Sequence, residues 1–273
     1  MFIQNNLSLL NSYKKFTSNK TAKNDNIEKI ASGKRINKAA DDAAGLFIRE
    51  SLKAQVRGLN VAERNIQDGN SLLQVADGAM EEITKAVHRM KEVAFEASNG
   101  TLTNEDRSAL EKEFNQLNLN IDSIVDKTEF NGIKLLNEDK SLNIKIKDNP
   151  EVFYGLTLFD SSTSALGLDT ASLISISSSS DTISKVDEAL NKVIVNRTIL
   201  GGHSNNLQSA FNDANNAKLN LTSALSQIED VNMATAVMKS IKDNVLINSN
   251  QSMLASARQN NESVNIIINK WLS

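Results

Sequence analysis

Asp41 and Asp42 are adjacent carboxylates, and a pair of carboxylates is one of the residue sets that general acid–base catalysis uses. Successive side chains of an α-helix point about 100° apart, however, so two adjacent acids on a helix do not converge on one substrate atom. No histidine lies near them in the sequence. We therefore expect the pair to start a helix or to belong to an interface.

The chain of 273 residues contains two histidines and no cysteine. His88 and His203 stand alone, without the HExxH spacing of a zinc site, and the absence of cysteine excludes thiolate nucleophiles and disulfides. Gly58, Gly69 and Gly78 are spread along a predicted helix, so they indicate close approach of neighbouring helices and not a phosphate loop. We expect no enzymatic activity, no catalytic residue, no metal and no cofactor.

Serine and threonine are concentrated in residues 161–180, which together with Gly167 predict a loop or surface insertion. The candidate acceptors of an O-linked sugar in this segment are Ser175, Ser177, Ser178, Ser179 and Ser180. A bare flexible loop is the alternative interpretation.

A long heptad pattern of apolar residues predicts the main helix of the chain. Its apolar residues stand seven apart: Leu52, Leu59, Ile66, Leu73, Met80, Val87 and Ala94. A second row three places later contains Ala62, Gly69, Ala76, Ile83 and Met90. Such a pattern predicts one helix from about residue 40 to 97 that lies along a partner helix, and the seam itself spans on the order of 65 Å.

Further elements follow from shorter patterns. The sequence Ser98-Asn99-Gly100 predicts the end of the long helix, and Thr103 begins a second amphipathic helix. Alternating apolar residues in 142–159 predict a β-hairpin. Helical spacing returns at Ile183 and shifts phase after Ile228, which predicts a boundary there.

Both ends of the chain carry apolar stripes on otherwise polar helices, and a single copy could hardly bury these stripes. We therefore predict a mainly α fold. It is a long antiparallel coiled-coil-like helical rod with a small β-hairpin region, in which both termini pair as helices. Residues 1–60 hold eleven Lys/Arg against five Asp/Glu, but they contain no reading motif. We expect no nucleic-acid and no membrane partner.

Several linked segments carry a resemblance. They are SGKRIN (32–37), ADDAAGL (40–46), QVRGL (55–59), AERNIQDG (62–69), Glu229-Asp230, Asn232-Met233-Ala234 and QSMLA (251–255). In this order they closely resemble bacterial flagellin over nearly the whole chain outside about 138–180. The resemblance implies a structural subunit that polymerises into the flagellar filament for motility.

The resemblance also implies a domain organisation. Residues 1–44 with 232–273 would form an inner, channel-lining assembly domain whose helices become ordered on assembly. Residues 45–231 would form the rod, with the hairpin and loop insertion at about 138–180. The expected interface residues are Leu7, Leu10, Arg35, Asn37, Asp41, Asp42, Leu52, Leu59, Ile66, Leu73, Val245, Met253 and Leu254.

The partners that the resemblance implies are further copies of the chain, an export chaperone, and the cap and hook-junction proteins. Localisation would be the extracellular flagellum, reached by type III export without a Sec signal. The innate immune receptor for flagellin is a possible host partner, with Arg89, Val93 and Glu113 at the matching positions. Because Lys38 and the end at 269–273 depart from the family pattern, a hook–filament junction protein that does not polymerise is the alternative.

Overall fold

The computed structural model of the chain describes residues 7–149 and 151–272, with side chains for residues 9–149, 151–260, 262, 263 and 266. The chain forms two compact units. Unit 1 takes its described residues from Met1–Ala54 and Leu221–Ser273, and unit 2 is Gln55–Asn220. The division falls inside α2 (Ala43–Ala97) and α5 (Ile176–Glu229), so each helix contributes to both units. The domain organisation expected from the sequence has its boundaries at 44/45 and 231/232.

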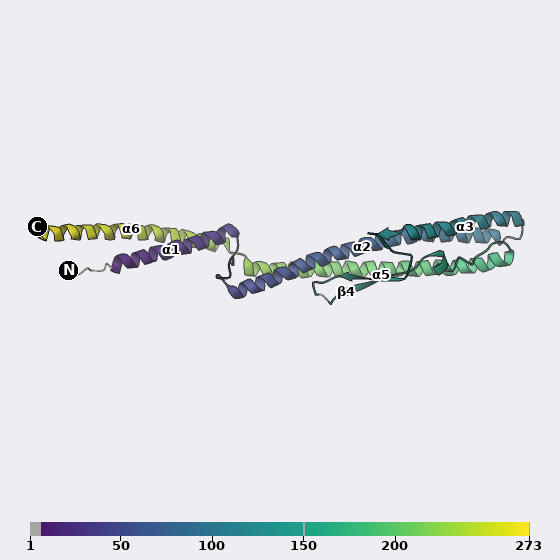
Figure 1. Ribbon diagram of the computed structural model, residues 1–273, viewed down its shortest axis with the longest axis horizontal. Helices are drawn as coiled ribbons and strands as arrows, with labels where there is room; N and C mark the ends of the chain where they lie inside the picture. The colour runs from purple at the N-terminus through teal and green to yellow at the C-terminus, as the bar shows by residue number, and fades with distance from the viewer. Residues whose placement is uncertain (1–6, 150, 273) are drawn as a thin grey trace. The chain divides into compact units, whose positions relative to one another are not determined.

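In unit 2, α2 runs beside α3 (Asn104–Lys127) and α5 (Figure 1). The heptad positions of α2 are buried from Leu59 to Ala94, which confirms the seam. Buried residues of the other two helices complete the core: Phe114, Ile121, Val125, Val186, Val193, Leu200 and Leu207. Ion pairs from Asp77 to Arg197 and from Glu63 to Lys218 link α2 to α5 across the edge of this core.

The turn between α2 and α3 forms as the sequence predicts. α2 ends at Ala97, and Thr103 caps α3 in a capping box with Asp106. Buried Arg107 donates from Nε to the Ala97 carbonyl at 3.1 Å and from Nη2 to the Asn99 carbonyl at 3.0 Å. The guanidinium thus satisfies carbonyls that the end of α2 leaves without a helical partner.

Two short antiparallel hairpins follow α3. β1 (Glu129–Phe130) and β2 (Ile133–Lys134) are joined by Asn131-Gly132, both with positive φ, as a tight hairpin turn requires. β3 (Lys140–Lys145) pairs with β4 (Phe153–Leu158) in the register Lys140↔Leu158. The hairpin predicted from the alternating apolar residues is thereby confirmed, and Leu156 and Leu158 are buried in the core.

The prediction of a loop over 161–180 is wrong at both ends of the segment. α4 (Thr163–Leu166) begins at the N-cap Ser162 and stops at Gly167, which has a φ of 82°. α5 begins at Ile176, where the Ser175 hydroxyl accepts a hydrogen bond from the Ser178 N–H at 3.2 Å. Serine side chains cap helices as readily as they populate loops, and a serine-rich composition does not separate the two.

The glycines of α2 have a partner that was not predicted. A Cβ on Gly58 would lie 2.6 Å from the Asp148 Cβ, and a Cβ on Gly69 would lie 2.3 Å from the Ile144 Cδ1. Both neighbours belong to the β3–β4 region, so these glycines admit the hairpin, and Gly69 also faces α5, since its Cβ would lie 3.3 Å from the Leu207 Cδ1. Gly78 has open space around it.

Unit 1 contains α1 (Leu7–Ser32) and α6 (Met233–Leu272), which lie side by side and antiparallel (Figure 1). α5 ends at Glu229 and α6 begins at Met233, so the predicted boundary after Ile228 is confirmed. Large apolar side chains of this helix pair are exposed, among them Leu10, Tyr13, Met238, Ile241, Val245 and Met253. The pair therefore leaves much of its apolar surface uncovered.

Candidate assembly site at the helix breaks of unit 1

Two breaks in the helices of unit 1 meet and form what we call the joint: residues 32–42 and 228–232, together with Arg49 and Lys53. The two breaks pair through their backbones. The Arg35 N–H donates to the Glu229 carbonyl at 2.6 Å, the Val231 N–H donates to the Gly33 carbonyl at 3.0 Å, and Lys34 forms an antiparallel bridge with Asp230. Gly33 has a φ of 70°, which favours glycine at the end of α1.

Arg35 and Asp42 each complete a helix end at the joint. The Arg35 Nε and Nη2 donate to the Ile228 carbonyl at 3.2 and 3.0 Å, where α5 is about to end. The Asp42 Oδ1 accepts from the Gly45 N–H at 2.9 Å and so caps α2. This confirms the helix-start interpretation for Asp42. A Cβ on Gly45 would lie 2.6 Å from the Ile36 Cδ1, so glycine lets buried Ile36 pack against the start of α2.

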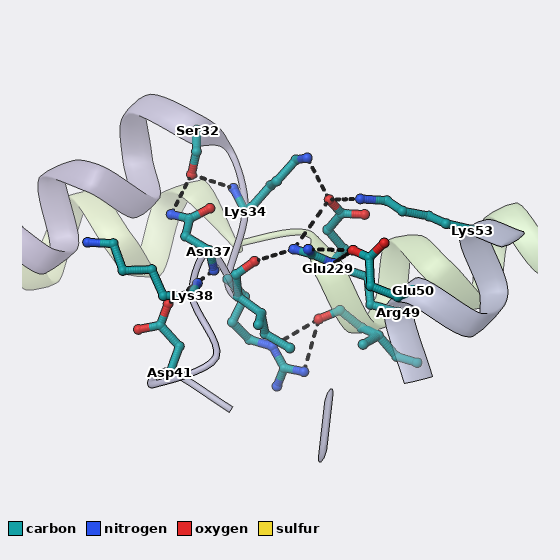
Figure 2. A network of polar contacts seen from close by, with 12 residues as sticks. Ser32, Lys34, Asn37, Lys38, Asp41, Arg49, Glu50, Lys53 and Glu229 are labelled. Atoms are coloured by element: carbon teal, nitrogen blue, oxygen red, sulfur yellow. Dashed lines mark hydrogen bonds and ion pairs between the residues drawn. The ribbon is translucent and has the colours of Figure 1, made fainter. Parts of the chain in front are cut away.

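Glu229 is the centre of the joint. Its carboxylate Oε1 lies 2.7 Å from the Lys34 Nζ, 3.1 Å from the Lys53 Nζ and 4.0 Å from the Arg49 Nη1, and the side chain is 7% exposed. Figure 2 shows the carboxylate between Lys34 and Lys53, with Arg49 beside it. Burial alone would raise the pKa of Glu229, but hydrogen bonds from Lys34 and Lys53 outweigh it, so the pKa is lowered and the carboxylate stays charged.

Asp41 holds the turn between α1 and α2. Its Oδ2 accepts from the backbone N–H groups of Asn37 and Lys38 at 3.0 and 3.1 Å. The N–H of Lys38 and then that of Asn37 lower the pKa of Asp41. The Asn37 Nδ2 in turn donates to the Ser32 Oγ at 2.9 Å, at the end of α1 (Figure 2). Asp41 and Asn37 therefore shape the backbone of the joint.

This arrangement consists of backbone pairing, helix caps and ion pairs. The Asp41 and Glu229 carboxylates are occupied by backbone donors and cations, and no histidine, cysteine or activated hydroxyl converges on them in the described part of the joint. The joint fixes the backbone path between α1 and α2 and between α5 and α6. Of the predicted interface residues, it brings together Arg35, Asn37, Asp41 and Asp42.

The other predicted interface residues lie elsewhere. Leu10, Val245 and Met253 are exposed on the helix pair of unit 1, while Leu254 and Leu52 are half-buried. The side chain of Leu7 lies outside those that the structure describes. Leu59, Ile66 and Leu73 are buried inside unit 2. These three form the helix interface within the chain, so they are not free to contact another copy.

Sequence reasoning missed Lys34, Arg49, Lys53 and, above all, Glu229 as members of the joint. One signal was available. Glu229 stands in the last turn of a helix, where the helix dipole disfavours an acid. An acid in that position needs cations nearby, but the sequence does not tell which of the distant lysines and arginines supply them.

The candidate receptor patch lies in unit 2. The Arg89 Nε and Nη2 donate to the Glu113 Oε1 at 2.9 and 2.8 Å, and Arg89 Nη1 donates to the Glu92 Oε2 at 2.9 Å. The structure therefore brings Arg89 and Glu113 together on the surface. Val93 is fully buried, so the surface contact assigned to it is corrected: its side chain packs inside the core.

The candidate sugar acceptors differ in accessibility. Ser175, Ser177 and Ser180 are exposed, and Ser178 is half-buried. Ser179 is fully buried, with its hydroxyl 2.9 Å from the Ser175 carbonyl oxygen, to which it donates. Burial removes Ser179 from the candidates in the folded chain.

The described part of the chain also bears on metal binding and membrane insertion. No group of three acidic, histidine or cysteine residues there could hold a metal ion. None of the helices described combines the length and apolar character that crossing a membrane requires.

Comparison with known proteins gives a consistent result. Residues 3–141 match the bacterial flagellin N-terminal helical region, and residues 183–266 match the bacterial flagellin C-terminal helical region. The chain is 38% identical to a flagellin of Halalkalibacterium halodurans over 97% of this chain and 98% of that protein. It is 35% identical to a flagellin of Bacillus subtilis with the same coverage.

Solved structures agree. The crystal structure of Bacillus cereus flagellin is 30% identical and matches 55% of this chain and 88% of that chain with a TM-score of 0.50. A putative flagellar hook-associated protein from Vibrio parahaemolyticus shares the fold, with a TM-score of 0.60 over 70% of this chain and all of that chain, but is only 14% identical. Because the curated relatives that match nearly the whole chain are flagellins, the junction-protein alternative is not favoured. With both terminal regions matched and near-complete coverage of curated flagellins, the chain belongs to the bacterial flagellin family and is a structural subunit of the flagellar filament.

Proposed function

We propose that unit 1 is the part of this flagellin through which copies of the chain assemble, and that the joint sets the geometry of assembly. The observation that carries the proposal is the buried Glu229 carboxylate, held by Lys34 and Lys53 where the four helices of unit 1 meet. Beyond the joint, α1 and α6 expose Leu10, Val245 and Met253. Covering such apolar surface by other copies would stabilise a filament.

In this proposal the helix pair forms the inner, channel-lining layer, and the remainder of the chain forms the rod. The terminal helices become fully ordered only when they pack against neighbouring copies. The polar character of α1, with Asn, Ser, Thr and Lys between its apolar residues, supports this, because an isolated helix pair with little buried apolar surface gains little to offset its ordering entropy.

Seeded polymerisation of a Glu229→Gln variant tests the role of the joint. The amide keeps the shape of the side chain but removes the charge that holds Lys34 and Lys53, and we expect unit 1 to lose roughly 1–3 kcal/mol. The critical concentration for filament growth should rise about tenfold or more, measured by sedimentation and electron microscopy. Exposed Glu96 in unit 2 provides the matched control as Glu96→Gln, which should grow normally. Normal growth of the Glu229 variant would contradict the proposal.

We further propose that the chain leaves the cell through the flagellar type III apparatus, escorted by an export chaperone, and that it then meets the cap and hook-junction proteins. Family membership supports this proposal. The chain should accumulate inside cells whose flagellar export gate is inactivated, and should still be exported when the Sec pathway is inhibited. Export that stops only on Sec inhibition would refute it.

Arg89 and Glu113 suggest recognition by the innate immune receptor for flagellin. They form an exposed ion pair that an acidic or polar receptor surface could engage. We expect Arg89→Ala monomers to lose about tenfold in potency in a receptor reporter assay. Lys85→Ala, which removes an exposed cation from the same helix, is the control. Equal potency of both variants would leave Arg89 with a packing role alone.

Ser175, Ser177, Ser178 and Ser180 remain proposed acceptors of an O-linked sugar, supported by the exposure of three of them and the partial exposure of the fourth. Mass spectrometry of the peptide that covers these residues, taken from native filaments, would show the added hexose or related mass. An unmodified peptide would reject the proposal.

A further inference from the structure

The seam between α1 and α6 repeats with heptad spacing. The shielded positions of α6 are Ala236, Ser240, Asp243, Ile247, Asn250, Leu254 and Ala257, and those of α1 include Ser12, Phe16, Asn19, Lys23, Asn26 and Ile30. Steps of three and four residues keep each stripe on one side of its helix, as in a coiled coil. The two helices lie antiparallel against each other (Figure 1), so these stripes form the contact between them.

This seam is unusual because buried polar residues share it with apolar residues such as Ile247, while several large apolar residues lie outside it. Asn26, Asp243 and Asn250 are buried in the seam, whereas Ile27, Ile241 and Val245 are exposed. An ordinary amphipathic helix does the reverse and buries its apolar stripe. Apolar burial alone would therefore favour turning the helices so that the outer faces meet within one copy. Something else must hold the polar faces together.

Asn26 and Asp243 supply that specificity. The Asn26 Nδ2 donates to the Asp243 Oδ2 at 2.7 Å, and the two residues are 6% and 7% exposed. A buried polar group that loses its partner costs about 1–3 kcal/mol, so any other arrangement of the helices must meet that cost. Single buried polar contacts set register and partner choice in coiled coils for the same reason.

A shift of α1 along α6 by one heptad shows how the Asn26–Asp243 pair distinguishes the observed register from its neighbours. In an antiparallel seam, a slip in one direction places Asp243 opposite Gly33, which has no side chain to donate. A slip in the other direction places Asn26 opposite Ala236, which cannot accept. Each slip thus separates Asn26 from Asp243 and leaves one of them opposite a residue without a complementary polar side chain.

We propose that Asn26 and Asp243 are positioning residues that fix the register and the rotation of α1 on α6, so that the apolar faces stay outward for other copies of the chain. The inference rests on the proposed role of unit 1 in assembly. According to this inference, the contact between Asn26 and Asp243 decides which faces of α1 and α6 are presented to a neighbouring copy.

The test exchanges the two side chains. Asn26→Asp places two carboxylates in the seam, and hydrogen exchange of α1 and α6 amides in filaments or seeded mixtures should then lose about tenfold or more of its protection. Adding Asp243→Asn restores an amide–carboxylate pair with the roles reversed, and should return protection to within about threefold of wild type. Asn24→Asp is the matched control, because it makes the same substitution at an exposed position of α1. It should leave the protection of the α1 and α6 amides unchanged.

If Asn26→Asp only disturbed the local structure, adding Asp243→Asn would not restore the protection. Recovery of protection in the double variant is therefore the decisive result. If Asn26→Asp keeps full protection, or if the exchanged double variant stays as unprotected as the single one, the inference is overturned. Filament growth, measured in parallel, tests the role of unit 1 separately. Growth that persists after the α1–α6 protection is lost would refute that role while supporting the positioning pair.

Discussion

Charged and polar residues of this chain act by satisfying ends and breaks of helices. Glu229 accepts from two lysines, Arg35 donates to the last turn of α5, and Arg107 donates to the end of α2. Arg35 and Arg107 satisfy carbonyls that the end of a helix leaves without a partner, while Lys34 and Lys53 offset the acid that stands in the last turn of α5. The placement explains why a chain rich in ionisable groups shows no reacting constellation in its described part: its charges are used at helix ends and between helices.

His203 should make the β3–β4 hairpin sensitive to acid. Its Nδ1 lies 2.7 Å from the Tyr154 hydroxyl and its Nε2 lies 3.0 Å from the Thr157 hydroxyl, and Asn206 donates to the same Tyr154 oxygen. Burial lowers the pKa of His203, so the folded hairpin favours the neutral ring. The stabilisation is therefore complete above the ordinary value of about 6.5 and is lost as pH falls below it.

Hydrogen exchange of β4 amides at pH 7.5 and 5.5, corrected for the intrinsic rates, measures this effect. We expect the wild-type hairpin to lose roughly 0.5–1.5 kcal/mol of local stability in acid, the contribution of about one hydrogen bond. His203→Gln cannot titrate and should show no such difference. A pH effect of equal size in both proteins would place its origin elsewhere.

At the scale of elements, α2 is the helix on which unit 2 is built. One stripe of α2 packs in the core with α3 and α5, and Gly58 and Gly69 make room for the β3–β4 region. Heptad spacing reports the first function because it is a periodic property of one helix. The packing of the hairpin depends on residues 75 and 90 positions further along the chain, Ile144 for Gly69 and Asp148 for Gly58, and the sequence pattern of α2 does not indicate them.

Two glycines of α2 provide a matched comparison. Gly69→Ala should destabilise unit 2 by about 1 kcal/mol, because the new methyl group would meet the Ile144 Cδ1 at 2.3 Å and the Leu207 Cδ1 at 3.3 Å. Gly78→Ala has open space and should instead stabilise the helix by up to about 1 kcal/mol. Urea denaturation of both variants measures the two changes in the free energy of unfolding. Stabilisation by Gly69→Ala would show that the hairpin does not seat on the glycine.

At the scale of the whole molecule, the two units differ in charge and in how much apolar surface they cover. Unit 1 holds fourteen Lys/Arg against nine Asp/Glu, and unit 2 holds sixteen against twenty-four. Unit 2 has a continuous apolar core, while the helix pair of unit 1 has a polar seam and exposed apolar faces. The proposed assembly through unit 1 would use this contrast, because the exposed apolar faces of its helix pair are available to be covered by other copies of the chain.

Removal of residues 1–40 and 232–273 should abolish filament growth and leave unit 2 folded. The remaining chain keeps α2, α3 and α5 and their buried seam, so circular dichroism should show a cooperative helical transition. Electron microscopy after seeding should show filaments for the full chain alone. Filaments from the truncated chain would move the assembly contacts to the rod, and loss of its cooperative transition would mean that the rod needs the terminal helices to fold.

The sequence by itself determined the helical class, the heptad seam of α2, the helix start at Thr103, the β3–β4 hairpin, the break after Ile228 and the flagellin family. These are local or periodic features, and their physical causes lie within a few turns of chain. It failed at 161–180, because serine serves loops and helix caps alike.

Only the tertiary structure decided which distant groups meet. It showed that Lys34 and Lys53 hold Glu229, that Val93 and Ser179 are buried, that a hairpin occupies the glycines of α2, and that Asn26 contacts Asp243 across 217 positions of sequence. Such contacts follow from the packing of whole helices, whose register and rotation are set by the sum of many weak interactions. No single segment carries that information, which is why the joint and the polar seam could not be read from the sequence.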